Sequence, residues 1–131
     1  MDFGNFETFF WIPLIINEDL YHFEQNKSEK TAFKWSNTNG KIKVDDITDF
    51  SIEVTQTIND SKSGRQEIPK EIKISSKQSN LNISLTSRGQ QVGYGIKYPK
   101  GLAYYRQSLL ISNTKSELSG YGMMELIIEN N

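Results

Sequence analysis

The sequence predicts an all-β domain, folded as an antiparallel barrel or a strongly bent β-sandwich of about eight or nine strands. Two observations carry this prediction. The first is composition, because the 131 residues include 15 Ile, 8 Thr and 15 aromatic side chains, which are residue types that favour strands. The second is pattern, because short runs of alternating apolar and polar residues are separated by Gly, Asn, Asp and Pro. Closely spaced strands and turns of this kind are typical of barrels and sandwiches.

Strands are expected where the alternation is clearest, and turns where the chain carries residues that adopt positive φ. The predicted strands, in chain order, are 9–16, 20–25, 32–36, 41–44, 50–58, 71–75, 81–85, 92–98, 102–112 and 121–129. The turn signals are at 17–19, 37–40, 59–64, 77–80, 87–89, 99–101 and 112–116.

The segment 41–50 has two interpretations. Ile42 and Val44 alternate with Lys, which favours a strand, whereas Asp45 and Asp46 would also suit the start of a short helical turn. We favour the strand for 41–44 and treat 45–49 as a connection.

Charge and composition exclude several classes of function. Lys and Arg total 15 against 16 Asp and Glu, so a net charge of −1 gives no electrostatic attraction to nucleic acid or an anionic membrane. The absence of Cys excludes thiolate metal sites and Cys nucleophiles, and a single His excludes a multi-histidine site within one chain. No apolar run is long enough to span a bilayer, and the N-terminus lacks a signal-peptide pattern. We therefore expect one cytoplasmic domain over 1–131, with no metal and no cofactor.

Four segments, in order, resemble the motifs of one protein family. The stretch Phe9-Phe-Trp11-Ile-Pro-Leu14-Ile-Ile16-Asn-Glu-Asp19 resembles Trp-x-Trp-Phe-x-Leu-x-Leu-x-Asp-Gly, and 20–23 resembles the strand that follows that motif. Segments 68–74 and 81–85 resemble a Pro-containing strand and an alternating leucine strand. Segments 104–111 and 120–126 resemble Tyr-Trp-Glu-Gly-x-Val-x-Val and Gly-x-Gly-Tyr-Met-Glu-Leu. These motifs are those of the lipocalin-like family of AttH-type proteins and carotenoid 1,2-hydratases.

The resemblance spans residues 3–127 and implies a lipocalin-like barrel. Members of this family carry two such halves in tandem, and the chain resembles one half, the C-terminal one more closely. This implies either a homodimer or a second lipocalin-like half. The family's Trp-Glu-Gly is Tyr105-Arg106-Gln107 here, and the family's upstream His has no counterpart, which argues against hydratase chemistry in this chain alone.

The expected function is therefore the binding of a small hydrophobic, isoprenoid- or lipid-like molecule in an aromatic-lined barrel. Two alternatives stay open: a hydratase- or cyclase-like enzyme acting on an isoprenoid, and a packed barrel with a structural or interaction role. The residues expected to bind the ligand are Trp11, Tyr21, Trp35, Tyr104, Arg106 and Glu125.

His22 is one of two weak candidates for a catalytic group, because His titrates near neutral pH. Alternation places His22 and Leu20 on one face of their strand, with Tyr21 and Phe23 on the other. The competing interpretation is a surface or hydrogen-bonded structural His.

Glu125 is the second candidate, because a carboxylate in a strongly apolar strand needs a partner or a raised pKa. It is interpreted either as a polar anchor or general acid in a pocket, or as a structural ion pair with Arg106 or a solvent-facing Glu. Asp45, Asp46 and Asp49 have the spacing of no calcium loop, so an exposed acidic turn is favoured there.

Overall fold

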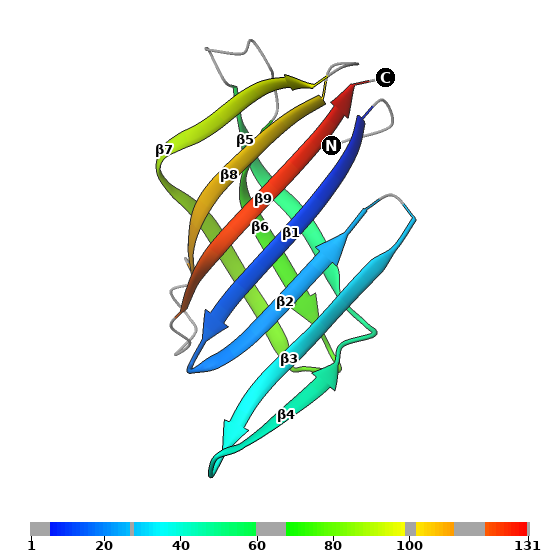
Figure 1. Cartoon of the computed structure of the whole chain (residues 1–131), viewed down its shortest axis with the longest axis vertical. Coiled ribbons are helices and arrows are strands. Elements are labelled where there is room, and N and C mark those ends of the chain that lie inside the picture. Colours follow the sequence, from blue (N-terminus) through cyan, green and yellow to red (C-terminus); the bar gives the residue numbers. More distant parts are fainter. Residues whose placement is uncertain (1–5, 27, 60–67, 99–101, 112–119, 131) are drawn as a thin grey trace.

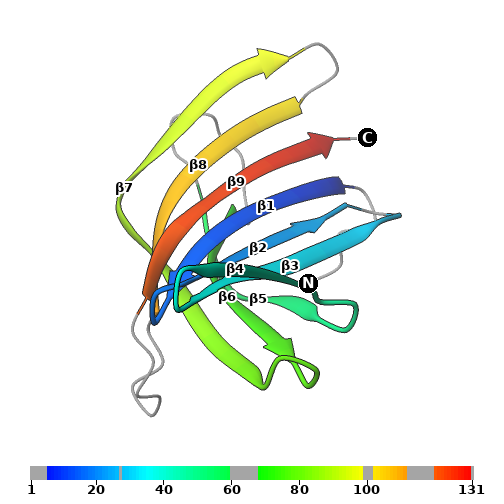
Figure 2. The same cartoon turned by 60° about the horizontal axis from the view of Figure 1, so that its bottom comes forward.

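Nine antiparallel strands form one strongly curled sheet, a half-barrel, in the computed structural model of the chain (Figure 1 and Figure 2). The structure describes residues 6–26, 28–59, 68–98, 102–111 and 120–130, and these residues contain no helix. The all-β, barrel-like prediction is confirmed. The strands are β1 (Phe6–Ile16), β2 (Asp19–Gln25), β3 (Lys30–Thr38), β4 (Lys41–Asp46), β5 (Ser51–Ile58), β6 (Ile68–Ser76), β7 (Leu81–Tyr98), β8 (Leu102–Ile111) and β9 (Gly120–Asn130).

The sheet is an up-and-down meander whose first and last strands meet at its centre. The strand order is β4-β3-β2-β1-β9-β8-β7-β6-β5, so β1 pairs with both β2 and β9. The two edge strands, β4 and β5, follow each other directly in the chain. Figure 2 shows how the curl carries β5 and β6 across from β3 and β4. The short connection between β4 and β5 therefore crosses from one end of the sheet to the other.

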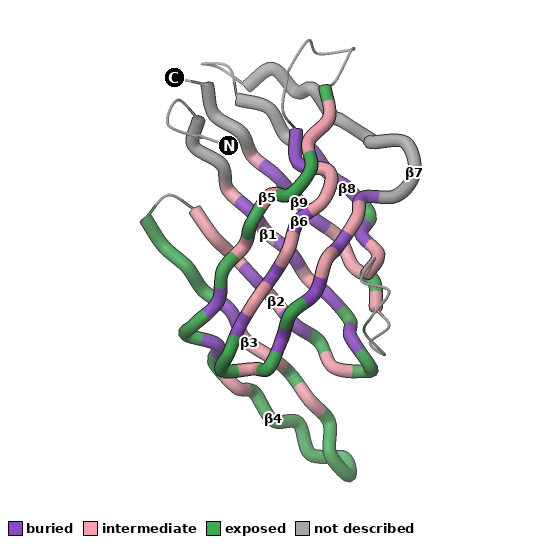
Figure 3. The backbone as a smooth tube through the Cα atoms, turned by 180° about the vertical axis from the view of Figure 1, so that it is seen from behind, coloured by how far each residue is buried: buried purple, intermediate pink, exposed green. Residues whose placement is uncertain are grey.

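The core fills the concave face of the curl, because every second side chain of a strand points to the same side. Figure 3 shows the resulting alternation of buried and exposed positions along the strands. Tyr21 and Phe23 are buried, as the predicted alternation of this strand requires, and Leu20 and His22 lie on the convex face. The buried apolar side chains form one cluster: Phe10, Ile12, Leu14, Ile16, Tyr21, Phe23, Ala32, Ile47, Phe50, Ile68, Ile72, Ile74, Leu81, Ile83, Leu85, Tyr105, Leu109, Met124 and Leu126.

The predicted strand at 41–44 is confirmed and extends to Asp46, so no helical turn begins at Asp45. The predicted turn at 87–89 is wrong, since 81–85 and 92–98 belong to the single strand β7. The register between β7 and β8 shifts between Arg88 and Val92, so Gly89 lies in an irregular stretch of a continuous strand, where glycine is also common.

Two tight hairpin turns set the register of the N-terminal half of the sheet. Asn17 and Glu18 join β1 to β2, and Asn39 and Gly40 join β3 to β4, and all four residues have positive φ. Such two-residue turns match the twist of the strands that they connect. The turns predicted at 17–19, 37–40 and 77–80 are confirmed, whereas 60–64, 99–101 and 112–116 lie outside the described residues.

The connection between β4 and β5 closes the core between the two ends of the sheet. Ile47 and Phe50 are both buried in the core cluster. The Phe50 ring packs edge-on against Phe23, with ring centroids 5.4 Å apart. The Lys30 ammonium group donates a hydrogen bond to the Phe50 carbonyl at 2.9 Å. The connection is thus fixed by burial on one side and by a charge-assisted hydrogen bond on the other.

The side chain of Gln78, in the turn between β6 and β7, holds this connection in place. Its Nε2 donates to the Asp46 carbonyl at 2.9 Å, while its Oε1 accepts from the backbone N–H groups of Thr48 at 2.8 Å and Asp49 at 3.2 Å. The neighbouring Ser76 hydroxyl donates to the Asp49 carbonyl at 2.6 Å. We call these contacts the Gln78 clamp. The amide replaces the strand partner that this backbone segment lacks.

The central strands β1 and β9 come unusually close at Gly122. A Cβ on Gly122 would collide with the carbonyl oxygen of Pro13 and with the side chain of Leu14. The pairing of β1 with β9 also lapses at Ile12 and Pro13. Proline has no N–H to donate to a neighbouring strand, which accounts for a local lapse in the ladder of a central strand.

We expect Gly122→Ala to lower the free energy of unfolding by about 2–3 kcal/mol, the upper part of the range for overpacking, because the new methyl group meets fixed backbone. Urea denaturation measures this change. The matched control is Gly40→Ala, where φ is +81° and no atom lies within 4 Å of the new Cβ. That substitution introduces backbone strain alone and should cost about 1 kcal/mol. Equal losses for the two variants would contradict the close approach at Gly122.

We expect Gln78→Ala to lower the free energy of unfolding by about 1–2 kcal/mol, because the clamp's hydrogen bonds are lost at a partly hydrated site. Gln78→Glu keeps the acceptor for Thr48 and Asp49 but loses the donor to Asp46, so its loss should be smaller. Lys77→Ala, in the same turn, should change stability by less than about 0.5 kcal/mol. A Gln78→Ala variant as stable as Lys77→Ala would show that the clamp does not hold the connection.

Candidate binding surface

The convex face of the sheet carries a row of exposed apolar side chains. Their strand positions are direct cross-strand neighbours on β9, β1, β2, β3 and β4, and their exposed fractions lie between 38% and 58%. We call them the apolar row: Tyr121, Ile15, Leu20, Trp35 and Val44. Single exposed apolar residues are ordinary, whereas a contiguous set is a candidate binding surface.

A shallow apolar recess opens at one end of the apolar row, with a volume of about 270 Å³. Its lining residues are Pro13, Leu14, Ile15, Leu20, Tyr121, Gly122 and Met123. The recess lies where the pairing of β1 with β9 lapses, beside Pro13 and the backbone of Gly122. The irregular ladder and the recess therefore occur at the same place in the sheet.

Four aromatic rings on the convex face contact one another in series across β1, β2 and β3. Trp11 meets His22 edge-on with centroids 5.7 Å apart, His22 stacks on Phe33 at 4.8 Å, and Phe33 lies 6.2 Å from Trp35. His22 Nε2 also lies 2.8 Å from a carboxylate oxygen of Glu24. This imidazole is therefore held between two rings and a carboxylate, and it lines neither of the two recesses described in this section.

The residues that the sequence predicted for a ligand site do not share one face. Tyr21 lies on the concave face, in the core. Trp11, Trp35 and Glu125 lie on the convex face, and Trp11 is the cross-strand neighbour of Glu125. The side chains of Tyr104 and Arg106 lie outside the described residues, but the backbone register sets these positions opposite Ile127 and Glu125.

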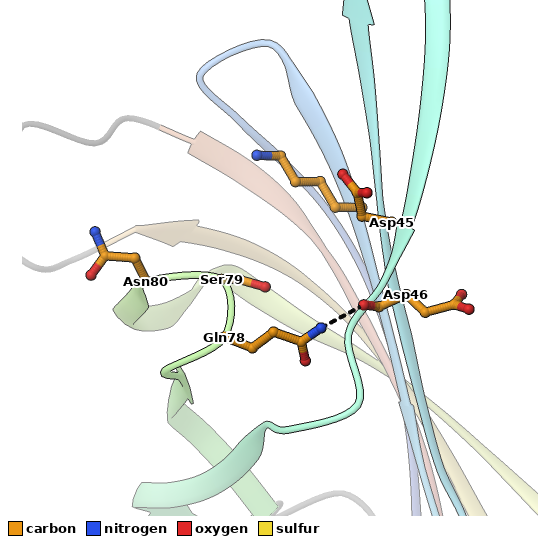
Figure 4. Close-up of a pocket in the computed structure, with 6 residues that line it drawn as sticks. Asp45, Asp46, Gln78, Ser79 and Asn80 are labelled. Carbon is orange, nitrogen blue, oxygen red and sulfur yellow. Dashed lines mark hydrogen bonds between the residues drawn. The ribbon is translucent and has the colours of Figure 1, made fainter.

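A second recess, polar and about 420 Å³ in volume, lies beside the Gln78 clamp (Figure 4). It is lined by Lys34, Asp45, Asp46, Gln78, Ser79 and Asn80. Figure 4 shows the Gln78 amide reaching the backbone of Asp46, whose carboxylate points away from Gln78. Within the described part of the chain, no group of three or more His, Cys, Asp or Glu side chains is arranged to hold a metal ion.

Lys34 supplies the positive charge of the polar recess. Its ammonium group lies 3.4 Å from an Asp19 carboxylate oxygen and 5.5 Å from the centre of the Tyr21 ring. Partial burial by itself would lower the pKa of Lys34, but charge interactions and hydrogen bonds with Tyr21 and Asp19 outweigh burial and raise it. Lys34 therefore stays charged at neutral pH and is engaged by groups on β2.

Sequence reasoning missed the apolar row and the Gln78 clamp. The alternation around the first tight turn could have predicted part of the apolar row, because it places Ile15 and Leu20 on the face opposite Leu14 and Tyr21. No pattern in the sequence predicts the Gln78 clamp, because Gln78 and Asp46 are brought together only by the curl of the sheet.

No protein-family model, curated protein or solved structure was found to match this chain. None of the described residues forms a helix long and apolar enough to cross a membrane.

Proposed function

We propose that the protein is a binding module that holds a small hydrophobic, isoprenoid- or lipid-like molecule on its convex face. The observation that carries the proposal is the apolar row, which ends in the recess between Pro13 and Tyr121. Exposed apolar surface has a solvation cost of about 25 cal/mol per Å², and a bound apolar molecule removes that cost. The recess has room for a ring or a short chain segment, and the row extends the contact toward Trp35.

The chemistry of this surface favours binding over catalysis. Ligand sites combine mostly apolar lining with a few polar groups, and the recess is lined by apolar side chains and glycine. A hydratase- or cyclase-like reaction needs a proton donor or acceptor beside the bound molecule. Neither His22 nor Glu125 lines the apolar recess or the polar one. The enzyme alternative therefore has less support than the binding module.

The proposal includes self-association of the chain. Among the described strands, β4 pairs only with β3, so its other long side has no strand partner there and is met by Gln78 at Asp46. An unpaired edge of this kind is a template for another strand. A homodimer is the form of self-association that the edge supports best.

We expect farnesol, as an isoprenoid probe, to quench or shift the fluorescence of Trp35 on titration, with saturation. Leu20→Ser should weaken binding at least fivefold, because a partly buried Leu side chain contributes about 1 kcal/mol to such a contact. The matched control is Ile42→Ser, which removes an exposed apolar side chain from the same face but lies outside the apolar row and the recess. It should bind farnesol as the unmodified chain does.

Two results would contradict this placement of the ligand. Leu20→Ser and Ile42→Ser could bind farnesol equally well, which would rule out the apolar row. Binding that survives Leu20→Ser but is lost in Tyr21→Leu would instead assign the ligand to the concave face. Circular dichroism on each variant separates loss of binding from loss of fold.

A further inference from the structure

We propose that two copies of this chain join through β4, edge to edge, in one continuous antiparallel sheet with Val44 on the two-fold axis. The inference rests on the self-association included in the proposed function and adds the strand, the register and the charges that select a second copy. Three observations carry the inference. The first is which residues of β4 turn their backbone N–H and C=O groups away from β3. The second is that the ladder at the β4 edge is regular and the ladder at the β5 edge is not, and the third is the charge pattern of Lys41–Asp46.

The free side of β4 presents the backbone groups of Ile42, Val44 and Asp46. The two-residue turn makes Thr38 and Lys41 a hydrogen-bonded pair, and such pairs recur at every second residue of an antiparallel ladder. The N–H of Ile47 donates to the Ala32 carbonyl at 2.8 Å, as expected if every second residue from Lys41 bonds to β3. Lys41, Lys43 and Asp45 therefore bond to β3. Ile42, Val44 and Asp46 point their N–H and C=O groups to the other side, where the Asp46 carbonyl already accepts from Gln78.

The two edges of the sheet differ in how well they could accept another strand. The ladder of β4 with β3 is regular over six consecutive pairs, from Lys41 to Asp46. The ladder of β5 with β6 shifts register twice, between Val54 and Thr57. Irregularities of this kind protect an edge strand from pairing. β4 is thus the edge that remains open to a regular partner strand.

The charges of β4 complement a second copy of β4. In a continuous sheet, opposite residues must lie on the same face, so identical strands can pair about Ile42, Lys43, Val44 or Asp45. An axis at Ile42 sets Lys41 opposite Lys43, and an axis at Asp45 sets two Asp45 side chains opposite each other, so both place like charges together. With Val44 on the axis, each Lys43 faces Asp45 of the second copy, which gives two opposite-charge pairs. With Lys43 on the axis, two like charges meet at the centre. Charge therefore selects the register with Val44 on the axis.

The Gln78 clamp sets the end of the paired segment. Gln78 already donates to the Asp46 carbonyl at 2.9 Å, so the edge beyond Asp46 is occupied by the chain itself. Pairing is then centred on Val44, and at each end the Asp46 N–H donates to the Ile42 carbonyl of the second copy, while Gln78 keeps the Asp46 carbonyl. On the convex face, this register brings the two copies of Val44 together, each beside its own Trp35, so the apolar row continues from one copy to the other.

The first measurement is the mass of the unmodified chain by native mass spectrometry and light scattering, where a dimer is expected at micromolar concentration. The second is oxidation of single-cysteine variants, which is unambiguous because the chain has no other Cys. Val44→Cys should form an intermolecular disulfide readily. Ile42→Cys should not, because its two copies would lie about 13 Å apart along the strands, beyond disulfide reach. Glu53→Cys, on the β5 edge, is a second negative control.

Charge exchange tests the register independently. Lys43→Glu and Asp45→Lys should each weaken the dimer at least fivefold, because each places like charges opposite each other. The double variant with both changes restores opposite charges and should dimerise within twofold of the unmodified chain. Lys43 is largely exposed and Asp45 is about half exposed, so the fold should be retained, as circular dichroism can verify.

The outcomes separate the inference from the proposal on which it rests. A monomer at all concentrations would overturn both the self-association and the β4 interface. A dimer in which Val44→Cys stays reduced, or in which Glu53→Cys links instead, would keep the self-association and overturn the interface. A dimer unaffected by all three charge variants would overturn the register. Farnesol binding is measured separately and is decided by Leu20, which lies outside this interface.

Discussion

Burial of the concave face requires the two ends of a nine-stranded sheet to meet over a common core, and the connection between β4 and β5 makes this meeting possible. Ile47 and Phe50 enter the core from this connection, and Gln78 and Lys30 hold its backbone from outside. Because the edge strands are consecutive in the chain, closing the curl needs only this short segment. The entropy cost of closing so short a loop is small.

The packing of the core bears on the proposed binding surface. The described concave side chains pack against one another, and the exposed large apolar side chains among the described residues lie on the convex face. Pro13 lies beside the recess on this face, where the pairing of β1 with β9 lapses. A Pro in a central strand is locally unfavourable, because it has no N–H to donate to the ladder.

The sequence predicted the fold class and most strands because alternation is a local property. It assigned Tyr21 and Phe23 to one face and Leu20 and His22 to the other, as the structure has them. Alternation does not tell which face is inside when both carry aromatic residues, so Trp11 and Trp35 were expected beside Tyr21. The turn predicted at 87–89 failed for a related reason, since glycine serves a bulge as well as a turn. The Gln78 clamp depends on the curl, which no local pattern contains.

The two edges of the sheet together determine what kind of assembly the chain can form. A protein with two open edges would add copies without limit, as strands do in fibrils. Among the described strands, the ladder of β5 with β6 is irregular and that of β4 with β3 is regular. The proposed two-fold contact between copies of β4 would use this edge of each copy, which limits such an assembly to two chains. The charge pattern around Val44 adds selectivity, since Lys43 and Asp45 complement an identical strand but not a strand of uniform charge. In the proposed dimer, the edge of β4 would thus be confined to one partner and one register.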